Sequence, residues 1–181
     1  MLTATLKPKA CQHCGSTFTP QRLMAQVCSP ICARRLVDAK KAAEKAQIKA
    51  RKEAIKTYSE WKADAQKAVN EYVRLRDQGK PCISCQKSWD TTFQAGHYRS
   101  RGAAPQLALD PRNIAGQCVQ CNLHKHGNQA AFRLGLIERE GVAHVEAIES
   151  ENEPLKLSVD ELRQVKVIHK GLARALKKEH S

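Results

Sequence analysis

Residues 82–128 read CISCQKSWDTTFQAGHYRSRGAAPQLALDPRNIAGQCVQCNLHKHGN and contain the pattern that decides the fold. Two Cys-x-x-Cys pairs, Cys82/Cys85 and Cys118/Cys121, stand near the two ends of this stretch. A tight turn with two cysteines can supply two neighbouring corners of a tetrahedral zinc ion, so two such turns complete one structural site. We therefore expect one zinc ion to fix the base of the long segment between the pairs.

Three polar residues in this stretch have no role in a simple zinc ribbon. They are His97, Asn113 and Asn122. Hydrolysis of a phosphodiester needs a base for the attacking water and positive charge beside the phosphate, which a histidine and a divalent metal ion can supply. The set therefore favours a nuclease. A DNA-binding zinc ribbon without catalysis explains the cysteines and remains an alternative, as does a zinc-bearing assembly adaptor.

The same residues resemble the HNH, or ββα-metal, endonuclease motif in its H-N-N form. A longer run resembles the phage NinG (Rap) family of recombination nucleases: Ala95-Gly96-His97-Tyr98, Arg101-Gly102, Asn113, Gln117-Cys118, Cys121-Asn122 and Gly127-Asn128. The resemblance extends upstream through Asn70-Glu71-Tyr72 and Arg74-Leu75-Arg76-Asp77, and it includes the N-terminal cysteines. It therefore covers most of the chain.

This resemblance implies a fold, an activity and a substrate. The fold is α+β and mostly helical, with a small zinc-stapled ββα-metal core, an N-terminal zinc module, a long basic helix and C-terminal helices. The activity is metal-dependent DNA endonuclease of the Holliday junction resolvase type, acting on branched recombination intermediates in the cytoplasm of a bacterial host, from a phage or prophage gene. We expect a homodimer. An HNH nuclease that cuts ordinary duplex DNA is the alternative enzyme.

The resemblance also assigns roles to single residues. His97 is expected to be the general base, Asn113 to fix the hairpin and the orientation of His97, and Asn122 to bind a catalytic Mg²⁺ or Mn²⁺ ion. The position before the histidine, which usually holds an acidic metal ligand, is Gly96.

A hard cation prefers oxygen ligands and usually needs a carboxylate. Within residues 82–128 we expect Asp110, rather than Asp90, to supply it. His124 and His126, at i and i+2, cannot share one face of a regular helix. His126 lies four residues after Asn122, could share its face and is a further candidate ligand.

Charge points to a polyanionic partner. The 181 residues carry a formal net charge of +13, with a pI near 9.6. Such an excess attracts nucleic acid. The guanidinium group pairs with phosphate through two hydrogen bonds. The candidate phosphate-binding residues are Arg99, Arg101, Arg112, Arg34, Arg35, Lys40 and Lys41.

A second cysteine cluster lies near the N-terminus. Its residues are Cys11, Cys14, Cys28 and Cys32, spaced C-x2-C-x13-C-x3-C, which suits a second structural zinc ion. His13 is expected to be a bystander. No signal peptide is evident and no apolar run reaches the ~20 residues of a membrane span. A reducing compartment is therefore expected, where paired thiols hold zinc more often than they form disulfides.

The remaining sequence predicts helices and four regions. The regions are an N-terminal zinc module (1–32), a long helix (33–77), the nuclease core (78–128) and C-terminal helices (129–181). Strong helix formers without proline or glycine fill 33–77, with a basic first half and an apolar stripe in the second. The basic half is either a solvated spacer or a rod that follows a phosphate backbone. Further helices are expected at 129–140, at 142–148 and after the capping box Ser158/Glu161.

Overall fold

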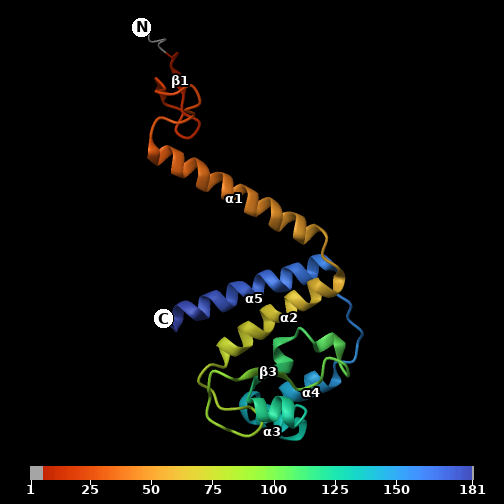
Figure 1. The fold of residues 1–181 in the computed structure, drawn as a ribbon. Helices are drawn as coiled ribbons and strands as arrows, with labels where there is room; N and C mark the ends of the chain where they lie inside the picture. Colours follow the sequence, from red (N-terminus) through yellow and green to blue (C-terminus); the bar gives the residue numbers. More distant parts are fainter. Residues whose placement is uncertain (1–5, 181) are drawn as a thin grey trace. The chain divides into compact units, whose positions relative to one another are not determined.

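The computed structural model describes residues 6–180 and divides into two compact units, Met1–Lys56 and Thr57–Ser181 (Figure 1). The helices are α1 (Pro30–Ala54), α2 (Tyr58–Arg76), α3 (Gln129–Glu140), α4 (Val142–Ser150) and α5 (Val159–Glu179). The strands are β1 (Lys9–Ala10), β2 (Thr17–Phe18), β3 (Gln94–His97) and β4 (Ile114–Gln117). Two 3₁₀ turns, Pro105–Leu107 and Pro111–Asn113, and a π-helical turn, Gln120–His124, complete the elements. The expected mostly helical α+β class is confirmed.

The first unit is a small cysteine module followed by a basic helix. Strands β1 and β2 pair antiparallel, with Lys9 opposite Phe18. Helix α1 begins where the side chain of Ser29 accepts a hydrogen bond from the backbone N–H of Cys32, and Pro30 occupies the first turn. Cys32 is the buried residue of α1. Most of the apolar side chains after it are alanines, which offer little surface to bury.

The single helix expected over 33–77 is instead two helices. Helix α1 ends at Ala54, and α2 begins at Tyr58. Thr57 accepts a hydrogen bond from the backbone N–H of Glu60, while the Glu60 carboxylate accepts one from the backbone N–H of Thr57. This reciprocal capping box satisfies backbone N–H groups that have no partner within the new helix, so α2 starts as a separate helix.

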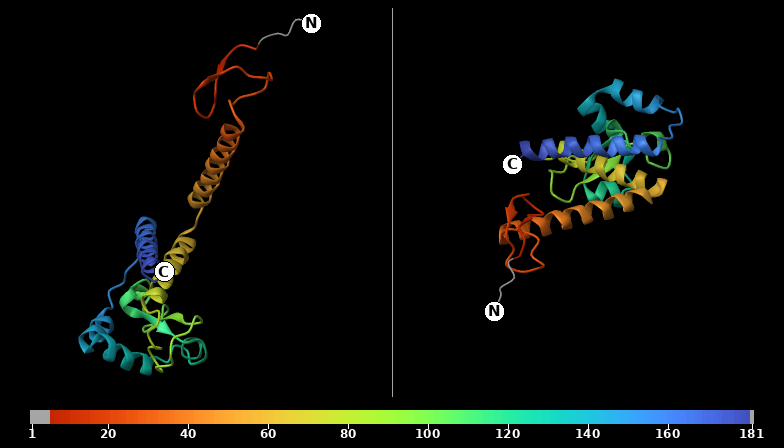
Figure 2. Two further views of the ribbon diagram at one scale, coloured as in Figure 1. Left: turned by 90° about the vertical axis from the view of Figure 1, so that its left-hand side faces the viewer. Right: turned by 90° about the horizontal axis from the view of Figure 1, so that it is seen from above.

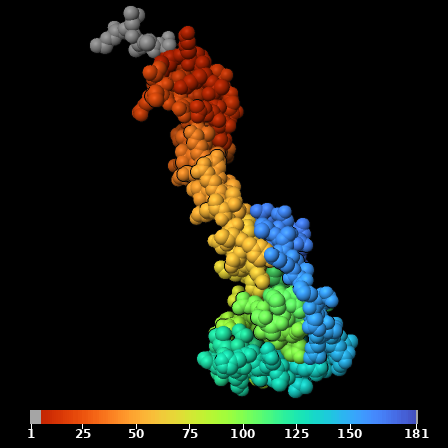
Figure 3. All heavy atoms as spheres, turned by 90° about the vertical axis from the view of Figure 1, so that its right-hand side faces the viewer, coloured from red at the N-terminus to blue at the C-terminus, as the bar shows by residue number. Residues whose placement is uncertain are grey.

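In the second unit, α2 and α5 pack side by side. The views of Figures 1 and 2 agree on this arrangement, and Figure 3 shows the C-terminal segment lying against α2. Trp61, Ala65 and Leu162 are buried where the two helices meet. The capping box predicted at Ser158 and Glu161 is present at the start of α5. Within residues 6–180, none of the helices combines the length and apolarity that crossing a membrane requires.

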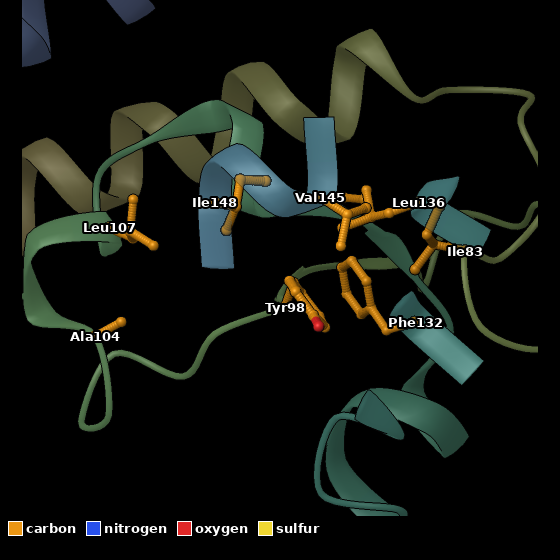
Figure 4. Close-up of a cluster of buried hydrophobic side chains, with 9 residues drawn as sticks. Ile83, Tyr98, Ala104, Leu107, Phe132, Leu136, Val145 and Ile148 are labelled. Atoms are coloured by element: carbon orange, nitrogen blue, oxygen red, sulfur yellow. The ribbon is translucent and has the colours of Figure 1, made fainter. Parts of the chain in front are cut away.

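A two-stranded hairpin carries the central stretch. Strands β3 and β4 pair antiparallel, with Gly96 opposite Ala115 and His97 opposite Ile114. The chain after β4 forms the π-helical turn and then α3 and α4. Figure 4 shows the core on which these elements pack: Tyr98 and Phe132 lie together, with ring centroids 5.9 Å apart. The hairpin therefore rests on a helical layer.

Candidate functional site

Each cysteine tetrad is assembled with the spacing of a zinc site. The four sulfur atoms of each group lie within 4.8 Å of one another. Measured Sγ–Sγ distances are 3.6 Å for Cys14 and Cys28 and 3.7 Å for Cys85 and Cys118. Four sulfurs about 2.3 Å from one zinc ion lie about 3.8 Å apart. A disulfide needs about 2.05 Å, and all eight cysteines are unpaired thiols. Both tetrads could therefore hold zinc.

The thiols of a tetrad cannot all ionise without a cation. The pKa of Cys28 is raised to about 12, chiefly by a hydrogen bond with the Cys32 thiol. The pKa of Cys121 is also raised to about 12, chiefly by burial. Conversely, the backbone N–H of Cys14 is the largest cause that lowers the pKa of Cys11 to about 6. A zinc ion replaces the protons of all four thiols, since the thiolate is the metal ligand.

A cavity of about 680 Å³ opens beside the hairpin and brings His97 and Asn122 together. We call it the His97 cavity. Its lining residues come from α2, from β3 and the following loop, from the π-helical turn and the loop after it, and from the start of α3: Lys67, Asn70, Glu71, Arg74, Gln94, Ala95, His97, Ser100, Arg101, Asn122, Leu123, His126, Gly127 and Gln129. The N-terminal zinc module contributes none of them.

The surroundings of His97 lower its pKa and so favour the neutral imidazole. Its Nε2 lies 3.0 Å from the carbonyl oxygen of Ala108. A carbonyl oxygen can only accept, so Nε2 carries the proton and Nδ1 carries the lone pair. The amide nitrogen of Gln66 lies 3.4 Å from Nε2 and donates a hydrogen bond to the side-chain oxygen of Asn70. Burial, followed by the positive charge of Arg101, outweighs the bond to Ala108 and lowers the pKa of His97 below its usual value.

Asn113 is buried and braces the loop that follows His97. Its side-chain amide donates to the carbonyls of Arg99 and Leu107, at 2.9 and 3.2 Å, and its oxygen accepts from the backbone N–H of Arg99 at 2.8 Å. Leu107 directly precedes Ala108, whose carbonyl holds the His97 ring. Asn113 therefore positions the imidazole indirectly, through the loop.

Asn122 lies on the π-helical turn, and its side chain lines the His97 cavity. Its amide nitrogen donates to Oε1 of Gln94 at 2.6 Å, which turns the nitrogen toward β3. His126 also lines the cavity. The sequence predicted that His126 would share a helix face with Asn122. This reason was wrong, because the helical turn ends at His124 and His126 adopts a left-handed conformation with φ of 48°. His124 is exposed and does not line the cavity.

The carboxylates proposed from the sequence lie elsewhere. Asp110 caps a 3₁₀ turn and pairs with Arg112, with 2.7 Å between Oδ2 and Nη2, and Asp90 pairs with Lys87 at 2.9 Å. Neither residue lines the His97 cavity, where Glu71 of α2 is the acidic side chain. Sequence reasoning missed Glu71 as a site residue, although the motif Asn70-Glu71-Tyr72 belonged to the family resemblance.

The predicted phosphate-binding arginines separate into two groups. The guanidinium of Arg99 donates to the carbonyls of Ile148 and Glu151, at 3.1 and 2.9 Å, and closes the C-terminal end of α4. Arg112 is bound to Asp110. Arg101 is exposed and lines the cavity.

The four basic residues proposed on α1 are exposed: Arg34, Arg35, Lys40 and Lys41. Their contact with nucleic acid stays a prediction.

Comparison with known proteins identifies the family. The model of the family described as "Bacteriophage Lambda NinG protein" matches residues 3–179. The chain is 38% identical to Protein ninG of Salmonella phage P22, with 94% of this chain and 93% of the relative covered. It is 36% identical to Protein ninG of Escherichia phage lambda, with 93% of this chain and 92% of the relative covered. No solved structure matches. The chain belongs to the NinG family.

Proposed function

We propose that this chain is a metal-dependent DNA endonuclease of the HNH type, with His97 as the general base and Asn122 as one ligand of a divalent ion. The observation that carries the proposal is the neutral His97, bound through Nε2 to Ala108, in a cavity that also presents Asn122 and several cationic side chains. The order of a two-stranded hairpin and then a short helical turn supports the HNH assignment.

The residues of the cavity suit phosphodiester hydrolysis. Because its pKa is lowered, His97 is unprotonated near pH 7 and can take a proton from water at Nδ1. The Ala108 carbonyl then continues to accept from Nε2 and keeps the ring in place. Lys67, Arg74 and Arg101 line the same cavity and attract phosphate groups. A bound divalent ion would stabilise negative charge on the phosphate and on the leaving oxygen.

The substrate class rests on charge and on the family resemblance. The net charge of +13 supports a nucleic acid partner. Branched DNA is what the resemblance to recombination nucleases implies. A homodimer would present two His97 cavities to a junction and suit paired incisions.

The test is cleavage of a four-way DNA junction beside a duplex of matched sequence, with Mg²⁺ or with EDTA. His97→Ala should lose at least about 100-fold in rate, because a positioned base contributes about 10²–10⁴-fold. His124→Ala is the matched control, since its imidazole is exposed and lies outside the cavity. It should cut normally.

Each contrary result has a distinct meaning. Cleavage by His97→Ala at the wild-type rate would overturn the proposed mechanism. Wild-type protein that binds the junction but cuts nothing in Mg²⁺ would indicate a DNA-binding zinc protein. Equal cutting of junction and duplex would indicate an ordinary duplex nuclease.

A further inference from the structure

The His97 cavity contains one acidic side chain among its lining residues, all of which the structure describes. It is Glu71, on the face of α2 that also presents Lys67, Asn70 and Arg74 at helical spacing. A carboxylate among so many cationic groups is not needed to attract nucleic acid. It weakens that attraction, so its presence calls for another explanation.

The donors of the cavity fit a hard divalent cation. Glu71 offers carboxylate oxygens, and Asn122 offers its side-chain oxygen because its nitrogen is given to Gln94. Magnesium is commonly held by one or two carboxylates, with water and phosphate oxygens completing the shell. Within residues 6–180, only the two cysteine tetrads bring three or more Cys, His, Asp or Glu ligand atoms within 4.8 Å. The protein groups of the cavity could therefore supply only part of an ion's coordination shell, and water and phosphate oxygens would have to complete it.

The strand position before His97 cannot supply the carboxylate. A Cβ atom added to Gly96 would lie 2.2 Å from Oε1 of Gln117. Gln117 is fully buried, and its amide nitrogen donates to Ser84 and to the carbonyl of Gly127, at 2.8 and 2.6 Å. Any side chain at position 96 must displace this buried group. The acidic ligand therefore has to come from another element.

In this structure Glu71 is paired with a lysine from the C-terminal helix. Nζ of Lys177, on α5, lies 2.6 Å from Oε1 of Glu71. The side chains of Lys177 and Glu71 are 56% and 36% exposed, so water screens the pair. Exposed ion pairs contribute little to stability, so a dication can displace the ammonium group without a large loss.

We propose that Glu71 is the carboxylate ligand of the catalytic divalent ion, and that Lys177 occupies this carboxylate when the ion is absent. The inference rests on the proposed function for its site, but it concerns metal binding and not cleavage. It makes the C-terminal helix part of the site, because binding of the ion releases Lys177.

The test is Mn²⁺ binding to the full zinc-loaded chain, followed by electron paramagnetic resonance of the free ion. Glu71→Gln keeps the shape of the side chain and should weaken binding by about tenfold or more, since even outer partners of metal ligands contribute about 10–100-fold. Lys177→Gln breaks the same ion pair from the other side and should tighten binding. A purely structural role of the pair predicts instead that both variants behave alike.

Further variants keep the result decisive. Asp110→Asn should bind Mn²⁺ as the wild type does. Glu71→Gln with unchanged Mn²⁺ affinity, or a loss of binding in Asp110→Asn, would overturn the assignment of Glu71. Weaker binding in Lys177→Gln would overturn the role of Lys177. Unchanged zinc content and tryptophan fluorescence confirm that each variant is folded.

Failure of the inference and failure of the proposed function are separable. If His97-dependent cleavage occurs while Glu71→Gln binds Mn²⁺ normally, the nuclease stands and the ligand assignment fails. If Glu71 is required for Mn²⁺ binding while no DNA is cut, the ligand assignment stands and the nuclease fails.

Discussion

Gly135, in the middle of α3, should not tolerate alanine. A Cβ atom at this position would lie 1.8 Å from the carbonyl oxygen of Ile83 and 2.9 Å from its carbonyl carbon, where 3.0 Å is about the closest that such contacts come. The obstacle is backbone, so no change of rotamer relieves it. Ile83 is fully buried between Cys82 and Cys85, and the clash would therefore push on the zinc-binding turn.

The expected magnitude follows from two opposing effects. Overpacking a core costs about 1–3 kcal/mol, and a backbone contact this short belongs near the upper value. Replacing glycine by alanine in a helix gains about 1 kcal/mol. Gly135→Ala should therefore lower the free energy of unfolding by about 2 kcal/mol.

Gly171→Ala is the matched control. Gly171 lies inside α5, is exposed, and has nothing within 4 Å of the added Cβ atom. This variant should gain about 0.5–1 kcal/mol from helix propensity alone. Guanidinium unfolding followed by tryptophan fluorescence measures both variants, because Trp61 and Trp89 both belong to the second unit. Equal m-values would show that only stability changed. A Gly135→Ala protein as stable as the wild type would refute the reasoning.

Further predictions concern metal, pH, DNA binding and stability. Metal analysis should find two zinc ions per chain, and Cys85→Ser should remove one of them and destabilise the second unit, because structural zinc contributes folding free energy. The acid limb of the kcat/KM profile should lie below the usual histidine pKa of about 6.5, because the lowered pKa keeps His97 unprotonated to lower pH. Arg101→Gln should move that limb upward and reduce the salt dependence of DNA binding. Arg99→Gln should lower thermal stability and leave the salt dependence unchanged, since its guanidinium is bound to backbone carbonyls.

The cysteine sites could be predicted because their information is local. Spacing within each Cys-x-x-Cys pair fixes a turn, and the structure brings both tetrads together as expected. The helix starts show a similar dependence on short patterns. The pattern at Ser158 and Glu161 predicts a capping box, and the structure has it. The same four-residue pattern at Thr57 and Glu60 lies inside a long run of helix formers and starts a second helix there.

Glu71 and Arg99 could not be placed from sequence, because their surroundings are made by distant elements. Glu71 reaches the cavity only because α2 packs beside the hairpin. From the sequence, Arg99 is a candidate phosphate-binding residue. In the structure its guanidinium is bound to backbone carbonyls at the C-terminal end of α4. Charge patterning identifies cationic residues but does not show which of them the fold has already paired. Only the tertiary structure therefore distinguishes the arginines that are bound within the protein from the one that is exposed in the cavity.

The position of α2 against the hairpin depends on a buried ionic group at its C-terminal end. Asp77 is 2% exposed, and its carboxylate accepts from the backbone N–H of Gly116 at 2.8 Å. Arg76 donates to this carboxylate and to the carbonyls of Pro111 and Ile114, at 3.0 and 2.7 Å.

Burial alone would raise the pKa of Asp77, but the hydrogen bonds and charge of Arg76 outweigh it and lower the pKa below its usual value. An ionised carboxylate in such a place requires its partners, because a buried charge without them is strongly destabilising. Two adjacent residues at the end of α2 thus bind both the backbone of β4 and the turn before it. This buried ion pair therefore fixes the C-terminal end of α2 against β4 and the turn before it.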